Sequence, residues 1–304
     1  MSYVTDPSKW KDITPDMYDE INDEIQRTFD EGCHGNCSSC ESSCEEKDRL
    51  PVFAKRMYIV TSGKGGTGKS TITVMLAYEL ARQGARVGIL DCDLSASTIP
   101  QLMGLIGRQV TSAPDNKMNP VISPEGIKVM SFNLIEADRT APVLWPSGDQ
   151  YNVVSYMYSG TLWGGLDVLL IDMPSNGGDV HLDLFTEFPL SGTVIVTNPG
   201  NLAVQPVQRC ISMCRSLMAA PVALIENKSF DTVPTWQSMY DVSPLCQFVA
   251  VPLTAEITAA GDDGTMKQVD CSPLAPVVSY MNRMVSKPGP NYKKAANAPK
   301  AQGT

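Results

Sequence analysis

The feature that most constrains this chain is the segment Gly63–Ser70, which reads Gly-Lys-Gly-Gly-Thr-Gly-Lys-Ser. It matches the phosphate-loop pattern G-x-x-x-x-G-K-S/T, in which glycines let backbone N–H groups surround a phosphate. An apolar run at 57–60 precedes the loop, and a helical pattern extends from Ser70 to Gln83. The sequence therefore predicts a strand, a phosphate-binding loop and a helix whose N-terminus adds partial positive charge.

The loop also predicts individual contacts with a nucleotide. Lys69 is long enough to reach the β- and γ-phosphates, and the Ser70 hydroxyl is a suitable ligand for Mg²⁺. A second lysine, Lys64, is not needed to surround a phosphate in its own loop, so we expect it to act elsewhere. The loop residues expected to bind the nucleotide are Gly63, Gly65, Gly66, Thr67, Gly68, Lys69, Ser70 and Thr71.

Two further predicted strands end in carboxylates. The strand 86–90 is followed by Asp91 and Asp93, and the strand 168–172 ends in Asp172. Because ligands bind at the carboxyl ends of parallel strands, we expect these carboxylates to face the phosphates. Four apolar residues that end in an acid are typical of a Walker B strand, so Asp172 is expected to hold Mg²⁺ through a water.

The alternation of strand and helix signals from residue 54 predicts an α/β fold. We expect a doubly wound, mostly parallel sheet with a short N-terminal helical, cysteine-bearing extension. Three parts are predicted: a helix plus four-cysteine segment at 1–50, a P-loop domain at 54–285 and a disordered tail at 286–304. The predicted strands are 57–61, 86–90, 127–132, 168–172, 193–197, 222–226 and 248–251.

Four of the nine cysteines fall in one short window, at Cys33, Cys37, Cys40 and Cys44. Thiolates at this spacing are able to converge on one metal centre within a single loop. An iron–sulfur cluster, a structural zinc ion and a redox or cluster-free role are all open at this point. The other cysteines are expected to be mostly small buried side chains: Cys92, Cys210, Cys214, Cys246 and Cys271.

Bulk properties narrow the range of partners. The net charge of −9 over 304 residues argues against a nonspecific nucleic-acid surface. The chain has no 18-residue apolar run, its first residues lack a charged-then-apolar signal, and its last residues lack an amphipathic face. We therefore expect a cytoplasmic protein without nucleic-acid or membrane partners.

The double-lysine loop resembles that of the deviant Walker A ATPases, the group of MinD, ParA, the nitrogenase iron protein and the arsenite ATPase. The resemblance implies a nucleotide-sandwich homodimer in which Lys64 reaches the partner's phosphates and neutralises transition-state charge. It also implies that Asp93 orients the attacking water while Asp91 supports Mg²⁺. Asn227, which follows the strand 222–226, stands where this group places an adenine-reading asparagine.

Further segments resemble the Mrp/ApbC family of iron–sulfur cluster carrier and scaffold ATPases, and the chain looks like a divergent member. The resemblance covers about residues 54 to 285 and implies ATP, Mg²⁺ and a 4Fe–4S cluster as ligands. It also implies recipient apo iron–sulfur proteins, or a redox partner. The segments that carry it are Asp91–Asp93 with Ser97–Pro100 (D-x-D…G-P-S-x-P), Gly126–Ser131 (G-I-x-V-M-S), Asp179–Leu182 (D-E-H-L), Ile225–Asn227 and Val251–Leu253.

One departure from that family concerns the cluster itself. Family members carry a C-x-x-C shortly after the E-N-M segment, and cysteines from two protomers hold a bridging cluster there. The corresponding stretch 228–234 reads Lys-Ser-Phe-Asp-Thr-Val-Pro and contains no cysteine. Eukaryotic cytosolic members have an N-terminal four-cysteine site with wider spacing, so the window at 33–44 partly compensates.

The function expected from these observations is that of an ATP-hydrolysing iron–sulfur cluster carrier that works as a homodimer. Two alternatives remain open at this point. One is an ATP-gated reductase that resembles the nitrogenase iron protein and uses the cluster as an electron donor. The other is a MinD/ParA-like positioning ATPase whose cysteines hold a structural zinc ion.

Overall fold

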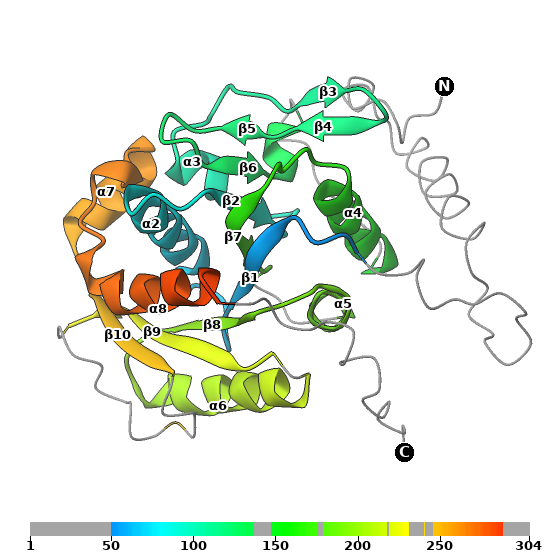
Figure 1. Cartoon of the computed structure of the whole chain (residues 1–304). Coiled ribbons are helices and arrows are strands. Elements are labelled where there is room, and N and C mark those ends of the chain that lie inside the picture. Colours follow the sequence, from blue (N-terminus) through cyan, green and yellow to red (C-terminus); the bar gives the residue numbers. More distant parts are fainter. Residues whose placement is uncertain are drawn as a thin grey trace, which may run out of the picture.

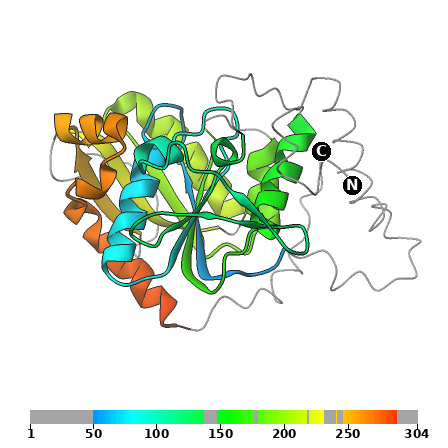
Figure 2. The same cartoon turned by 90° about the horizontal axis from the view of Figure 1, so that it is seen from above.

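A computed structural model describes residues 50–136, 147–174, 179–217, 219–230, 240 and 246–287. These residues form an eight-stranded sheet in the order β10-β9-β8-β1-β7-β2-β6-β5, with helices on both faces (Figures 1 and 2). Neighbouring strands pair in parallel, except that β5 runs antiparallel to β6. The predicted doubly wound, mostly parallel α/β fold is confirmed.

The strands and helices have the following bounds. The strands are β1 (Ala54–Thr61), β2 (Val87–Asp91), β3 (Thr111–Ala113), β4 (Lys117–Asn119), β5 (Val121–Ile122), β6 (Lys128–Met130), β7 (Leu166–Asp172), β8 (Gly192–Thr197), β9 (Pro221–Ser229) and β10 (Gln247–Pro252). The helices are α2 (Lys69–Arg82), α3 (Ile99–Leu102), α4 (Ser147–Ser159), α5 (Asp179–Glu187), α6 (Asn201–Ser216), α7 (Ala255–Asp263) and α8 (Ala275–Val285).

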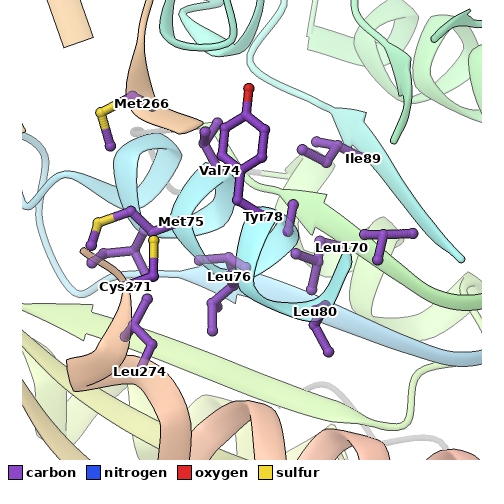
Figure 3. Packing of buried hydrophobic residues seen from close by; sticks show 14 of the residues in the cluster. Val74, Met75, Leu76, Tyr78, Leu80, Ile89, Leu170, Met266, Cys271 and Leu274 are labelled. Carbon is purple, nitrogen blue, oxygen red and sulfur yellow. The ribbon is translucent and has the colours of Figure 1, made fainter. Parts of the chain in front are cut away.

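Successive side chains of a strand point to opposite faces of the sheet, and both faces here are apolar. In β1, Tyr58 and Val60 belong to a buried cluster with residues of α2, α3, α7 and α8. Met57 and Ile59 belong to a second cluster with residues of α4, α5 and α6. Figure 3 shows part of the first cluster, which includes Leu76 of α2 and Leu170 of β7. The sheet is therefore a central layer between two helical layers, as Figure 1 shows.

The seven predicted strands are all present, with boundaries that differ by a few residues. One end was wrong: β6 stops at Met130, and residues 132–134 form a short 3-10 helix instead of extending the strand. The hairpin of β3 and β4 and the short β5 were not predicted. Asp115 and Asn116 both adopt positive φ in that hairpin turn, at 58° and 54°, which these two residue types tolerate better than most.

The cysteines outside the N-terminal window behave as expected, because Cys92, Cys210, Cys214, Cys246 and Cys271 are all buried free thiols. The predicted N-terminal helix, the window Cys33–Cys44 and nearly all of the predicted tail lie outside the described residues. Among the described helices, none combines the length and the apolar character that crossing a membrane would require.

Candidate nucleotide site

The predicted site residues gather at the carboxyl ends of the parallel strands. The phosphate loop follows β1, Asp91 ends β2, Asp172 ends β7 and Asn227 lies near the end of β9. In the register of the sheet, Asp172 is the Cα partner of Asp91 on one side and of Val60 on the other. This edge of the sheet is where ligands bind in open α/β folds.

The loop between β1 and α2 has the conformation that its glycines allow. Gly66 and Gly68 have φ of 75° and 86°, and Gly68 is the residue directly before the helix. A Cβ on Gly63 would lie 2.5 Å from the backbone carbon of Pro206 in α6, so only glycine fits there. Lys69 is 7% exposed, whereas Lys64 is exposed at the rim of the loop.

Thr67 adds a sign that the loop is built for a ligand. Its side chain is 1% exposed, and its hydroxyl has no hydrogen-bond partner among the described residues. A buried hydroxyl that makes no hydrogen bond is unfavourable unless another group supplies one. A phosphate in the loop would supply acceptor oxygens beside it.

Asp172 is fixed by two hydroxyls of α2. Ser70 Oγ donates to Asp172 Oδ2 at 2.6 Å, and Thr73 Oγ1 donates to Oδ1 at 2.7 Å. The sequence motif indicated Ser70 but not Thr73, which lies one helical turn after Lys69 and also donates to its carbonyl at 3.0 Å. The sequence signal that could have indicated this contact is a threonine one helical turn after Lys69, on the same face of the helix.

Asp91 is held by three donors from two segments. Its Oδ1 accepts from the backbone N–H of Asp93 at 3.1 Å, and its Oδ2 accepts from the hydroxyls of Ser97 and Ser131, the latter at 2.9 Å. Both serines belong to motifs found in the sequence, but no role was predicted for either. They come from the segment after β2 and from the end of β6.

The electrostatics of this pair favour a bound cation. Burial and then the charge of Asp172 raise the pKa of the Asp91 carboxyl above its ordinary value of 3.8. Burial also raises the pKa of Asp172, although the bonds from Ser70 and Thr73 and the charge of Lys69 oppose the rise. Two close carboxylates in a dry site repel each other, and a divalent cation relieves that repulsion. Hydroxyl and carboxylate oxygens are the ligands that Mg²⁺ prefers.

Asp93 lies beside this pair and is held in place by its own loop. Its Oδ1 accepts from the backbone N–H of Ala96 at 3.0 Å and from Ser95 Oγ at 3.3 Å. His181 of α5 is within electrostatic reach of both Lys69 and Asp93. Burial, reinforced by the charge of Lys69, lowers the pKa of His181 and so favours its neutral imidazole.

A cavity of about 320 Å³ opens next to the loop. Asn227 and Thr71 line it together with apolar groups of Leu102, Pro252 and Leu253. Polar side chains, among them Thr98, Gln101 and Thr254, complete the lining, so a flat base would find both apolar surface and hydrogen-bonding groups there. Only Asn227 was predicted to lie near a base, because the other walls come from separate segments that the fold brings together.

The sheet, the loop and the paired carboxylates define a P-loop NTPase with the deviant Walker A loop. Comparison with known proteins narrows the class. The ParA family model described as NUBPL iron-transfer P-loop NTPase matches residues 54–287. The chain belongs to this family, which confirms the resemblance to iron–sulfur cluster carrier ATPases.

Similar proteins agree with that assignment. An iron–sulfur cluster carrier protein of Methanococcus maripaludis is 34% identical over 226 residues, which cover 70% of this chain and 78% of the relative. One of Methanocaldococcus jannaschii is 30% identical over 282 residues, which cover 84% and 97%. A solved nucleotide-binding protein from Archaeoglobus fulgidus in complex with ADP is 28% identical, with a TM-score of 0.59 over 71% of this chain and 89% of that one. The MinD cell division protein of Aquifex aeolicus, at 19% identity and a TM-score of 0.55, shares the fold over 76% of this chain and 97% of that one.

Proposed function

We propose that this chain is a Mg²⁺-dependent ATPase that carries iron–sulfur clusters and works as a nucleotide-sandwich homodimer. The observation that supports it most strongly is the connection between the phosphate loop and the carboxylates. Ser70, the loop residue suited to Mg²⁺, donates to Asp172 at 2.6 Å, and Asp172 pairs in register with Asp91. A metal held at this point would lie next to the phosphates that the loop binds.

Each residue then has a role in hydrolysis. Lys69 and the loop N–H groups would bind the β- and γ-phosphates, while Ser70, Asp172 and Asp91 would hold Mg²⁺, which would neutralise phosphate charge. Asp93 would orient a water that attacks the γ-phosphorus. The bond from the γ-phosphorus to the β-phosphate oxygen breaks, one proton of the water passes to an oxygen of the transferred phosphoryl group, and ADP and phosphate leave. The adenine enters the cavity beside Asn227.

Lys64 is proposed to act on the partner's nucleotide. Its side chain is exposed, and Ser62 Oγ donates to the Lys64 backbone carbonyl at 2.7 Å, which fixes the start of the loop. An ammonium at the rim of one loop is suited to reach a γ-phosphate across a two-fold interface, where it would stabilise the transition-state charge.

The cluster is the cargo, and the N-terminal cysteines are the proposed site for it. The described residues contain no group of three or more histidines, cysteines or acids that could hold a metal ion. Their five cysteines are buried in the core. We therefore propose as cluster ligands the four cysteines of the N-terminal window, Cys33, Cys37, Cys40 and Cys44. In this proposal the segment 1–50 carries the cluster, residues 54–285 form the ATPase domain, and residues 286–304 form the tail. Delivery would be to apo iron–sulfur proteins.

The test is metal and turnover analysis of protein purified without oxygen. About four irons and four sulfides per chain, with ATP hydrolysis that requires Mg²⁺, would support a carrier with a 4Fe–4S cluster. One zinc per chain would instead indicate the positioning ATPase. A reversible one-electron reduction whose potential shifts with ATP would indicate the reductase. Absence of ATP binding would contradict the proposal as a whole.

A further inference from the structure

The end of β9 places two consecutive side chains against the phosphate loop. Asn227 Nδ2 donates to the carbonyl of Thr67 at 2.8 Å, and Lys228 Nζ donates to the carbonyl of Gly66 at 3.1 Å. Two neighbouring residues of one strand thus hold two neighbouring carbonyls of a loop about 160 positions away in the sequence. Asn227 is 4% exposed, so its bond is shielded from water.

These carbonyls determine the direction of the loop N–H groups. In a planar trans peptide, the C=O of one residue and the N–H of the next point in opposite directions. A bond to the carbonyl of Gly66 therefore directs the N–H of Thr67 away from Lys228. In the same way, the bond to the carbonyl of Thr67 directs the N–H of Gly68 away from Asn227. Consecutive N–H groups that are oriented together form an anion-binding concavity.

The strand is deformed at the position that supplies the lysine. Lys228 has φ of 59°, which is unfavourable for a residue with a long side chain. The register between β9 and β10 shifts by one residue at this point. Val251 pairs with Asn227, and the next residue, Pro252, pairs with Ser229. Lys228 is the extra residue, and such a bulge redirects a side chain.

The loop is adapted to the same contact. A Cβ on Gly68 would lie 2.3 Å from Asn227 Nδ2, so Asn227 could not keep this position if residue 68 carried a side chain. The loop and the bulged end of β9 are therefore matched to each other through Gly68, Asn227 and Lys228.

We propose that Asn227 and Lys228 are positioning residues that orient the N–H groups of Thr67 and Gly68 for the phosphates before the nucleotide arrives. This role rests on the proposed function, because it assumes that the loop binds a nucleotide. It differs from base reading, which was the role expected for Asn227. Fixed donors need no reorganisation when the charged ligand binds, so the loop binds phosphate more tightly.

The test uses two probes, ADP and pyrophosphate, because pyrophosphate has no base. Lys228→Met keeps a long side chain but removes the ammonium, and it should weaken the binding of both probes by about tenfold. Lys228→Arg, which retains a cationic donor, should recover part of the loss. Asn227→Ser should also weaken both probes. Lys267→Met, which changes a lysine paired with Glu125 at 3.5 Å, is the matched control and should bind both as the unaltered chain does.

Lys228→Gly provides a second variant if Lys228→Met does not fold, since glycine accepts the positive φ without strain. Unchanged pyrophosphate affinity in the Lys228 variants would overturn the proposal. Weakened binding of ADP alone by Asn227→Ser would overturn it as well, because that result means base reading. An unaltered chain that binds pyrophosphate but neither ADP nor ATP would refute the proposed function and leave the orienting role standing.

Discussion

Asp91 and Asp172 are register partners on the adjacent strands β2 and β7, and both are almost completely buried, at 1% and 0% exposure. Every oxygen of the two carboxylates accepts a hydrogen bond from a hydroxyl or a backbone N–H. The protein thus buries two ionisable carboxyl groups next to each other. Ionising both of them in this dry environment is unfavourable, and a bound divalent cation would make it favourable.

The pair should make the metal-free chain less stable as the pH rises. Because the pKa of Asp91 is raised above 3.8, the folded state binds protons more tightly than the unfolded chain. The linked stability is fully present below the unfolded pKa and is lost as the pH rises through the higher folded pKa. The loss is about 1.4 kcal/mol for each pH unit that separates the two values. Urea unfolding in the presence of a chelator, at about pH 5 and about pH 8, measures this loss.

Asp91→Asn is the control for that measurement, because the amide remains neutral over the whole range. Its unfolding free energy should change less between the two pH values than that of the unaltered chain. Added Mg²⁺ should reduce the difference between the two proteins at the higher pH. Parallel pH profiles for the variant and the unaltered chain would contradict the assignment of a strained carboxylate pair.

Thr73 should contribute to stability through Asp172. Thr73→Val keeps the shape of the side chain but removes the donor to Oδ1, which leaves that buried oxygen without its hydroxyl partner. We expect the unfolding free energy to fall by about 1–3 kcal/mol. Thr73→Ser, which keeps the hydroxyl, should lose less, and denaturant unfolding compares the two. A Val variant that is as stable as the Ser variant would show that the bond contributes nothing.

The Gly63 position should tolerate no side chain. A Cβ there would meet the backbone of Pro206 at 2.5 Å, and backbone atoms of a helix cannot move aside as a flexible side chain can. Gly63→Ala should therefore displace the loop from α6, weaken ADP binding and lower the thermal unfolding temperature. Gly65→Ala is a suitable comparison, because Gly65 belongs to the same loop and is exposed. Equal unfolding temperatures of the two variants would argue against the close approach of loop and helix, whereas ADP affinity does not separate them, because both glycines belong to the nucleotide-binding loop.

The sequence predicted the parts of the site that local patterns determine. The glycine spacing of residues 63–68 specifies a loop conformation by itself, and apolar runs that end in acids place Asp91 and Asp172 at strand ends. It did not predict that these two acids would be register partners, because β2 and β7 are distant in the sequence and are brought together only by the sheet. Ser131 comes from a third strand and was missed for the same reason.

Other features lack a sequence signal because they are irregular. Lys228 adopts positive φ at a bulge, where neither strand propensity nor motif spacing predicts its contact with Gly66. The β3–β4 hairpin has strands of three residues in which only Met118 is buried, so no alternation of apolar and polar residues identifies it. The bulge depends on the pairing of β9 with β10, whereas the hairpin is a local pairing for which the turn residues Asp115 and Asn116 are the available signal.

The cysteine segment should be separable from the ATPase domain. Cys37→Ala together with Cys40→Ala should remove the bound iron, whereas the thermal unfolding and ADP affinity of the domain should stay unchanged. The expectation is based on the two extensive buried clusters that the described residues form with one another. Cys210→Ala, which removes a buried core thiol, is the opposite control and should lower stability without loss of iron. Iron retained by the double variant would place the cluster elsewhere.

The role of Lys64 across the dimer allows the sharpest test. Lys64→Ala should bind ATP nearly as well as the unaltered chain, because Lys69 and the loop N–H groups remain, but should lower turnover by about a hundredfold or more. Lys69→Ala should instead lose nucleotide binding or turnover. Steady-state hydrolysis and ADP titration distinguish the two lysines. Unchanged turnover in Lys64→Ala would contradict the assignment.

Mixing two inactive variants then tests whether the lysine acts on the partner's nucleotide. Asp93→Asn lacks the water-orienting carboxylate but keeps Lys64, whereas Lys64→Ala keeps Asp93. In a mixed dimer, the site of the Lys64→Ala protomer has its own Asp93 and receives Lys64 from its neighbour, so hydrolysis should reappear. If Lys64 served its own site, neither site of the mixed dimer would be complete, and the mixture would remain as inactive as each variant alone.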